Sequence, residues 1–398
     1  MLRASARLNT ALDETMNPSP RYRIFVIGAG FSVHAGLPLG SQLFKAARDV
    51  VRHNHGSDNK LEQDLECYLR YRYHCDGLDR GDPVDYERFM SYLDLEHYLQ
   101  LRGSDTWSDE GNISQILIRN GIQEVIWKST PRAPTKECLH FCQQLLPRDI
   151  VLTFNYDTLI ETTLDHLGKQ YRLFPSRLKE VGPLMSIVDS EMEENEIQIS
   201  KLHGSIDWYD KAPYIQDRKL ASQHPYPWES RHPLFQDGSR ILSTQLVQGP
   251  CDPADPLGLV YRVSDLSELI GKQSLEFSPL LLSPSSSKIL YANPLKSLWR
   301  GLQQAGGLNY GLGIVGYSLP PYDEYARQAL YHLMRNYTEY DYDSVVFGRK
   351  KSPARIIDFA EPGSSDWIIR KNYSFMNWSR TELNTKGFCC EGIDWLML

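Results

Sequence analysis

The sequence has no Cys-x-x-Cys pair, and its seven cysteines form an odd, scattered set. Such a set does not make the disulfide framework of a small secreted domain, and a structural zinc module with two close-spaced pairs also needs the missing spacing. Cys138 and Cys142 share one helix face, but no second pair accompanies them, so they are predicted to lie in the core. The cysteines therefore predict reduced thiols and no metal site.

Long apolar runs and an excess of positive charge are missing too. No stretch approaches the roughly 18 apolar residues that cross a bilayer, and the N-terminus has no secretory signal. The 43 Lys and Arg against 50 Asp and Glu leave a net charge of -7, which excludes a surface that binds polyanions overall. We expect a cytoplasmic protein that binds neither membranes nor nucleic acid directly. The first twelve residues, with Arg3 and Arg7, are also compatible with an organellar transit peptide, although a disordered tail is favoured.

Short apolar runs that alternate with helical patterns predict an α/β fold with a doubly wound parallel, Rossmann-like sheet. One domain is expected over 21–362, after a disordered tail at 1–20 and before an irregular tail at 363–398. It contains a largely helical insertion at about 55–147 and an irregular, Tyr- and Trp-rich lobe at about 206–275. Helices are expected at 41–52 and 159–167. Strands are expected at 23–27, 149–153, 197–202, 277–282, 311–315 and 354–359.

Polar or glycine-rich segments follow the predicted strands directly. Gly28-Ala29-Gly30 allows a backbone to approach a pyrophosphate closely, next to the start of a helix, although such turns also serve packing alone. Asn155 and Asp157 also suit an ordinary turn that starts a helix, and a single His203 at a strand end is often structural. The carboxyl ends of parallel strands meet at one edge of a sheet. The occurrence of all these segments after successive predicted strands therefore favours a binding site at that edge.

Four motifs together resemble the sirtuins and, more closely, the sirtuin-like NAD hydrolases of bacterial antiphage systems: GAGFSVHAGLP at 28–38, TFNYD at 153–157, KLHGS at 201–205 and GYSLPPYD at 316–323. The resemblance implies NAD+ as the substrate and no metal cofactor. It implies that Asn155 contacts the nicotinamide ribose and the attacking water, and that His203 is the base. Asp323 is predicted to cap a helix. The other implied binding residues are Gly28, Ala29 and Gly30 in the glycine loop, Ser32 at the phosphate or ribose, Asp157 supporting the TFNYD loop, and Gly316 with Ser318 on the adenosine side.

The motifs differ from those of protein-deacylating sirtuins, which have TQNID where this chain has TFNYD and GIPDFR where it has GLPLG. Those sirtuins also carry a zinc module that helps to form the acyl-lysine tunnel. Without that tunnel, water is the expected acceptor, and the enzyme must stabilise oxocarbenium-like charge on the ribose. A protein deacylase or ADP-ribosyltransferase remains an alternative. A non-catalytic NAD or ADP-ribose sensor is another, against which Asn155 and His203 count.

The resemblance also implies a biological setting. An NAD+ hydrolase of this kind would act as an NAD-depleting effector of antiphage defence, through abortive infection. A homo-oligomer is expected, with a separate-chain partner such as a HerA-type ATPase or an Argonaute.

Overall fold

The computed structural model describes residues 22–79, 83–101, 111–175, 195–226, 228–229, 232–248, 254–271, 275, 277–283, 285–287, 291–320, 323–341, 348–359 and 367–397. The tail predicted at 1–20 lies outside the described residues.

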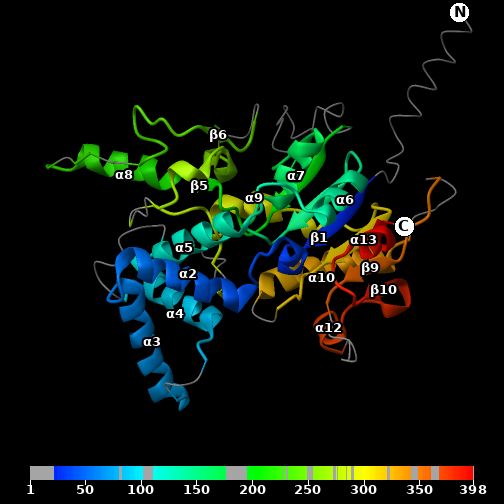
Figure 1. The fold of residues 1–398 in the computed structure, drawn as a ribbon, viewed down its shortest axis with the longest axis horizontal. Helices are drawn as coiled ribbons and strands as arrows, with labels where there is room; N and C mark the ends of the chain where they lie inside the picture. Colours follow the sequence, from blue (N-terminus) through cyan, green and yellow to red (C-terminus); the bar gives the residue numbers. More distant parts are fainter. Residues whose placement is uncertain are drawn as a thin grey trace, which may run out of the picture.

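A seven-stranded sheet with all its pairings parallel forms the centre of the fold (Figure 1). Its strand order is β10-β9-β8-β1-β2-β4-β3. Strand β1 lies in the middle and is buried along its whole length, as expected for a continuous apolar run covered on both faces. This confirms the predicted Rossmann-like α/β fold. The strands are β1 (Arg23–Ile27), β2 (Ile150–Thr153), β3 (Tyr171–Arg172), β4 (Ile197–Lys201), β8 (Gly311–Val315), β9 (Ala354–Ile357) and β10 (Thr381–Asn384).

The described residues of the segment predicted as a helical insertion contain helices α3 (Lys60–Asp76), α4 (Tyr86–Tyr98), α5 (Ile113–Ser129) and α6 (Lys136–Gln144). With α2 (Gly40–His55), the first three form a group beside the sheet (Figure 1). All four helices of the insertion begin at a side-chain cap, which explains where they start. Helix α5 is buried from Ser114 to Ile126, and it crosses α2 so closely that a Cβ on Gly121 would lie 2.7 Å from the carbonyl oxygen of Ala47.

The further helices around the sheet in the described part of the chain include α7 (Leu159–Leu167), α9 (Lys296–Trp299), α10 (Glu324–Glu339) and α13 (Cys390–Met397). Helix α6 packs against α7 and α13. Cys138 and Cys142 lie on α6 as free, fully buried thiols, in agreement with their prediction as core residues.

The lobe at 206–275 is more regular than predicted. It contains a second, antiparallel sheet of order β5-β7-β6 and a twelve-residue helix, α8. The strands are only three or four residues long, so no alternation was long enough to be read from the sequence. The elements are β5 (Trp208–Asp210), α8 (Ala212–Gln223), β6 (Ser243–Gln245) and β7 (Val260–Val263).

Two sequence predictions need correction. The segment 367–397, predicted as part of an irregular tail, contributes helix α12 (Trp367–Asn372), strand β10 and helix α13, and β10 completes one edge of the main sheet. The strand predicted at 277–282 is an extended segment with one isolated bridge, between Gly204 and Leu281. Its backbone bonds to the turn after β4, so Leu281 and Leu282 are buried although the segment joins no sheet.

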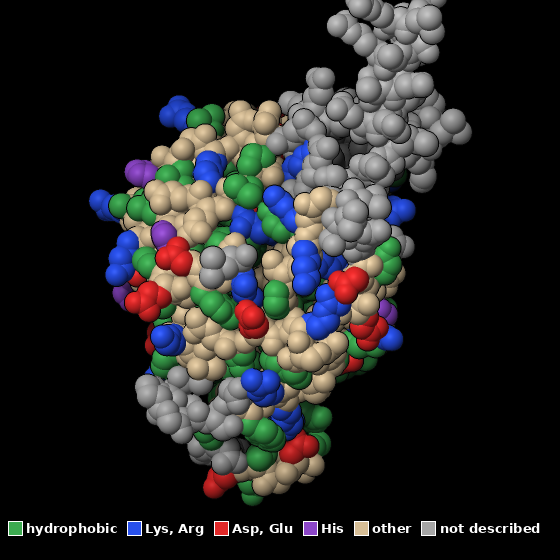
Figure 2. Space-filling model, turned by 90° about the vertical axis from the view of Figure 1, so that its right-hand side faces the viewer, with side chains coloured by type: hydrophobic (Ala, Val, Ile, Leu, Met, Phe, Trp, Pro, Cys, Tyr) green, Lys and Arg blue, Asp and Glu red, His purple; other side chains and the backbone are tan. Residues whose placement is uncertain are grey.

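The surface carries charges of both signs. On the face in Figure 2, Lys and Arg side chains are interspersed with Asp and Glu side chains and with apolar ones. This mixture agrees with the net charge of -7. In the part of the chain that the structure describes, no helix is long and apolar enough to cross a membrane.

Candidate active site

The carboxyl ends of β1, β2, β4, β8 and β9 meet around one cavity of about 690 Å³. All four motifs contribute to its wall, together with the start of α2 and the segment after β10. Of the nine binding and catalytic residues predicted from the sequence, six line the cavity: Ala29, Gly30, Asn155, His203, Gly316 and Ser318. Gly28, Ser32 and Asp157 lie behind this wall.

The glycine loop packs directly on the turn after β8. The backbone amide of Gly30 donates to the carbonyl oxygen of Gly316 over 2.9 Å, and that of Gly28 donates to Val315 over 3.0 Å. A Cβ on Gly30 would lie 2.7 Å from the Cα of Gly316, whose own φ is +58°. Glycine is therefore needed here for contact between two loops, in addition to any approach of a phosphate. The loop itself enters a 3-10 turn at Ala29–Phe31, and a second 3-10 turn at Val33–Ala35 follows before α2 begins.

A buried chain of hydrogen bonds fixes the side chain of Asn155. The Ser32 hydroxyl donates to Asp157 over 2.7 Å, so its oxygen is left to accept. The Asn155 amide nitrogen donates to that oxygen and to the Gly28 carbonyl, each over 3.0 Å. Both amide protons are thus used inside the protein, and Oδ1 is left as an acceptor on a residue that lines the cavity.

This network places Ser32 differently from the sequence prediction. Ser32 was expected to contact the phosphate or ribose, but its side chain is 2% exposed and is bonded below the cavity wall. Asp157 was expected to support the TFNYD loop, and its carboxylate accepts from Ser32 and from the amide of Leu159, at the start of α7. The two side chains connect the glycine loop to the TFNYD loop.

His203 follows β4 and is 6% exposed. Its Nε2 lies 2.7 Å from the hydroxyl of Tyr325, with donor and acceptor set by the tautomer. Phe154 meets the imidazole edge-on at 4.9 Å and stacks on Tyr317 at 4.1 Å with an interplanar angle of 1°. An aromatic wall thus stands where deacylating sirtuins carry the Gln of TQNID.

Sequence reasoning missed several residues of this site. Tyr325 lies two residues beyond the last motif, and its spacing from Asp323 was the only available signal. Asp358 and Phe359, after β9, and Lys386, after β10, also line the cavity. Asp358 and Phe359 were missed because the strand was predicted to run to 359, two residues beyond the observed end of β9, and Lys386 was missed because the segment after 363 was read as irregular.

Two further predictions concern Asp323 and metals. Asp323 stands at the N-cap position of α10 but makes no side-chain capping bond, and its carboxylate accepts from Tyr317 over 3.2 Å instead. Among the described residues, no group of three or more His, Cys, Asp or Glu is arranged to hold a metal ion. Burial raises the pKa of the Cys138 thiol to about 12, which keeps it protonated.

Part of this chain is similar in sequence to a known protein family. A family model described as a SIR2-like domain matches residues 149–236, which include β2, the TFNYD and KLHGS motifs, β4 and the start of the lobe. This chain is sirtuin-like. Sirtuin-like proteins use NAD+ as a substrate, and the match supports a family of NAD-dependent enzymes.

Solved structures similar to this sirtuin-like chain include one described as "The Structural basis of Sirtuin Substrate Affinity", at 11% identity, 97% coverage of each chain and a TM-score of 0.32. Another is described as "Structure of Sir2Tm bound to a propionylated peptide", at 11% identity, with 98% of this chain and 96% of that chain covered and a TM-score of 0.31. No curated protein sequence matches the chain.

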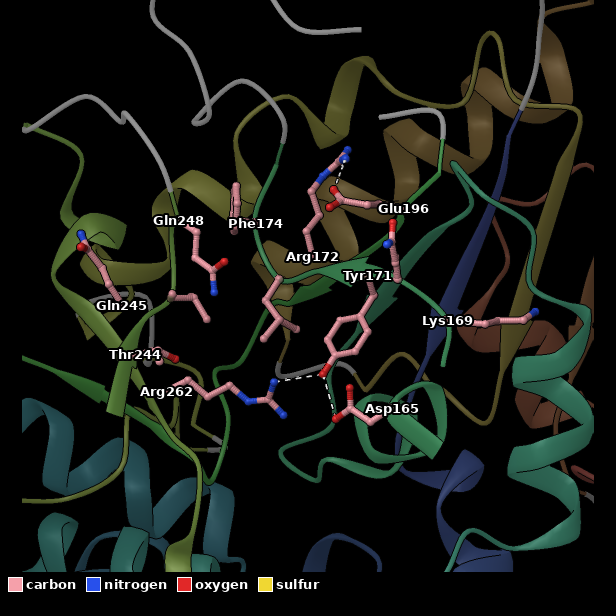
Figure 3. Close-up of a pocket in the computed structure, with 13 residues that line it drawn as sticks. Asp165, Lys169, Tyr171, Arg172, Phe174, Glu196, Thr244, Gln245, Gln248 and Arg262 are labelled. Carbon is pink, nitrogen blue, oxygen red and sulfur yellow. Dashed lines mark hydrogen bonds and ion pairs between the residues drawn. The ribbon is translucent and has the colours of Figure 1, made fainter. Parts of the chain in front are cut away.

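A second cavity, of about 460 Å³, lies between the edge strand β3 and the small sheet (Figure 3). None of the four motifs contributes to its lining. A tyrosine hydroxyl connects two of its charged groups: the Arg262 guanidinium donates to the Tyr171 hydroxyl over 3.0 Å, and that hydroxyl donates to Asp165 over 3.2 Å. The sirtuin motifs thus select the larger cavity as the candidate active site.

A buried lysine of the KLHGS motif forms an ion pair with α7 and a hydrogen bond with the TFNYD loop. Lys201, at the end of β4, is fully buried, and its Nζ lies 2.8 Å from Glu161 on α7 and also donates to the carbonyl oxygen of Asp157. Burial raises the pKa of Glu161. The ammonium group therefore compensates a buried carboxylate and holds the TFNYD loop beside the KLHGS strand.

We expect Lys201→Met to lower the free energy of unfolding by about 3 kcal/mol at pH 7, because it leaves a buried carboxylate without its cation. A raised folded pKa means that ionising Glu161 opposes folding, so the loss should shrink as pH falls through that pKa. Urea unfolding at pH 5 and pH 7 measures this difference. The double variant Lys201→Met/Glu161→Gln should recover part of the loss at pH 7, whereas a loss of the same size at both pH values would contradict the explanation.

Proposed function

We propose that this sirtuin-like chain is an NAD+ glycohydrolase that cleaves the bond between nicotinamide and ribose. The observation that carries the proposal is the meeting of Asn155 and His203 at one cavity that the glycine loop also lines. In this proposal the end of one strand would supply the backbone that faces the phosphates, and the ends of two neighbouring strands would supply the polar side chains. A nucleotide lying across these ends would have its diphosphate at β1 and its nicotinamide ribose at β2 and β4.

The reaction breaks the C1′–N bond and forms a C1′–O bond to water, so that NAD+ and water give nicotinamide, ADP-ribose and one proton. Positive charge develops on the ribose as the bond breaks, and nicotinamide leaves as a neutral group. Oδ1 of Asn155, fixed by its amide's two donated bonds, can accept from the attacking water or a ribose hydroxyl. His203 can take up the proton and return it to solvent.

The competing functions differ in the acceptor of ADP-ribose. A deacylase or an ADP-ribosyltransferase would need a peptide or protein, whereas a sensor would bind NAD+ without releasing nicotinamide. Incubating the purified chain with NAD+, with and without an acylated peptide, and measuring nicotinamide and ADP-ribose separates them. Peptide-independent release of both products in equal amounts supports hydrolysis. Release that requires the peptide would replace the proposal by the deacylase, and NAD+ binding without release would replace it by the sensor.

The same arrangement suggests which end of the cavity takes adenosine. Beyond Gly316 the cavity continues to Asp358 after β9 and to Lys386 after β10. One oxygen of the Asp358 carboxylate accepts from the amide of Phe359 over 2.8 Å. In the described residues, no ion pair neutralises this carboxylate. A carboxylate at this end can bind the ribose 2′-hydroxyl of NAD+ and repel the 2′-phosphate of NADP+.

We therefore expect kcat/KM for NADP+ to be at least about tenfold below that for NAD+, since roughly 1.4 kcal/mol of repulsion suffices. Asp358→Asn keeps the side-chain size and removes the charge. It should therefore bring the two kcat/KM values closer together, mainly by raising kcat/KM for NADP+. Nicotinamide release from both nucleotides, in the wild type and in this variant, provides the measurement. An unchanged ratio in Asp358→Asn would remove the carboxylate from substrate selection.

The biological setting is also a proposal, supported by the motif resemblance. Unrestrained hydrolysis would deplete the NAD+ of the producing cell, so we propose an effector of antiphage defence, acting in the cytoplasm and controlled by assembly. The assembly would be a homo-oligomer, with a separate-chain partner such as a HerA-type ATPase or an Argonaute. Light scattering that shows only a 46 kDa monomer at working concentration would count against the homo-oligomer.

A further inference from the structure

Asp323 is the last residue of the fourth motif, and the proposed reaction does not yet use it. The residue lines the cavity of about 690 Å³, and its side chain is only 6% exposed. Its carboxylate makes no capping bond to α10 and accepts from the hydroxyl of Tyr317 over 3.2 Å. A neutral amide would accept that hydrogen bond as well, whereas burying a carboxylate costs free energy. The charge itself therefore needs an explanation.

Two tyrosines show at which end of the cavity this charge acts. Burial of their hydroxyls raises the pKa of Tyr156 and of Tyr325, and the charge of Asp323 raises both further. Tyr156 directly follows Asn155 in the TFNYD motif, and the Tyr325 hydroxyl lies 2.7 Å from Nε2 of His203. The carboxylate thus acts beside the two polar residues that the proposed reaction places at the nicotinamide ribose.

The cavity wall carries more negative than positive charge. Apart from histidines, the charged residues in the described part of this wall are Glu87, Asp323, Asp358 and Lys386. Glu87 lies in the first turn of α4, and its charge also raises the pKa of Tyr156. A negative excess repels a diphosphate and attracts a cation. It therefore favours the cationic part of a nucleotide, rather than its diphosphate, beside Asp323 and Glu87.

NAD+ has one cationic group, the pyridinium ring of its nicotinamide, and the same ring is neutral in NADH. We propose that Asp323 supplies the counter-charge at the nicotinamide end of the cavity and thereby selects the oxidised nucleotide, NAD+, over NADH. The effect requires no direct contact, because a charge acts over several ångströms in a partly desolvated cavity. The inference rests on the proposed function, which places the nicotinamide ribose at the ends of β2 and β4.

Asp323→Asn tests the charge alone, because its amide oxygen can still accept from Tyr317. NAD+ must survive the titration, so the calorimetric Kd values for NAD+ and NADH are measured in the Asn155→Ala background. We expect NADH to bind at least about tenfold more weakly than NAD+ in this background. Adding Asp323→Asn should bring the two Kd values within about threefold of each other, mainly by weakening NAD+.

Asp165 offers a matched control at the second cavity. Its carboxylate also accepts from a tyrosine hydroxyl over 3.2 Å, that of Tyr171, and it lines the cavity of about 460 Å³. Asp165→Asn removes one negative charge from the same kind of hydrogen bond. It should leave the ratio of the two Kd values unchanged. An equal change of the ratio in both variants would reduce the effect to the net charge of the protein and overturn the proposal.

Other outcomes also decide the inference. A ratio below about three with Asp323 intact would overturn it without any variant of this residue. An unchanged ratio in Asp323→Asn would overturn it too, as would an equal loss of affinity for both nucleotides. If the wild type releases no nicotinamide, the proposed function fails. The wild type then replaces the Asn155→Ala background, and the same ratio still shows whether Asp323 selects the oxidised nucleotide.

Discussion

Asn155→Ala is expected to lower kcat for NAD+ hydrolysis by at least about a thousandfold, which corresponds to roughly 4 kcal/mol of lost transition-state stabilisation. The variant loses Oδ1, the acceptor that remains when both amide protons are bonded, on a residue that lines the cavity. Because Asn155 does not hold the diphosphate in the proposed arrangement, the affinity for NAD+ should change far less than kcat. Nicotinamide release and calorimetric NAD+ binding, measured on the same preparation, separate the two effects.

The substitution also has a structural cost that must be separated from catalysis. It removes two donated bonds, to Gly28 and Ser32, and should lower the free energy of unfolding by about 1 to 2 kcal/mol. Asn309 is the matched control, because it is fully buried and its side chain donates to the carbonyl oxygen of Gly311 over 2.8 Å. Gly311 is at the amino end of β8, whereas the candidate site lies at the carboxyl ends of the strands. Asn309→Ala should lose similar stability and keep its turnover. Full turnover in folded Asn155→Ala would overturn the assignment of the active site.

The sequence could predict most of the main sheet because its strands are continuous apolar runs. The strands at 23–27 and 311–315 have the observed bounds, and those beginning at 150, 197 and 354 differ by at most two residues at either end. Burial on both faces leaves a signal that is independent of the strand's neighbours. The same reasoning mistook 277–282 for a strand, because a buried extended segment beside the turn after β4 has the same apolar composition.

The edges of the sheet could not be predicted in this way. Strand β3 has two residues and β10 has four, of which only Thr381 is buried, so neither forms an apolar run. Their position depends on neighbours that are distant in sequence: β10 pairs with β9, and β3 pairs with β4. This is why the C-terminal part of the cavity wall, including Lys386, was missing from the predicted site.

The candidate site could also be predicted only in part. The order of the motifs along the chain predicted that Asn155, His203 and Gly316 lie at the same end of the sheet, and all three line one cavity there. The hydrogen bonds that orient them could not be read from order alone. Ser32 faces inward because the turn at 29–31 buries its side chain, and Tyr325 reaches His203 only through the packing of α10.

Gly30→Val is expected to abolish detectable NAD+ binding and to lower the free energy of unfolding by about 5 kcal/mol, at the upper end of single substitutions. The branched side chain would meet the backbone of Gly316, which lies 2.7 Å from the position of a Cβ on Gly30. Backbone on that side cannot rotate away, so the two loops must separate and the bond from the Gly30 amide to Gly316 is lost. The loops that would receive the diphosphate then no longer form one surface.

Gly307→Ala serves as the control for this prediction. Gly307 lies in the loop before β8, and an added Cβ would have only ordinary contacts there, 3.7 Å from the ring of Tyr340. That variant should keep both its stability, within about 0.5 kcal/mol, and its NAD+ affinity. Thermal unfolding and calorimetry on both variants make the comparison. Binding of NAD+ by Gly30→Val at wild-type affinity would show that the contact between the glycine loop and Gly316 is not required for the nucleotide site, and would move the diphosphate away from β1.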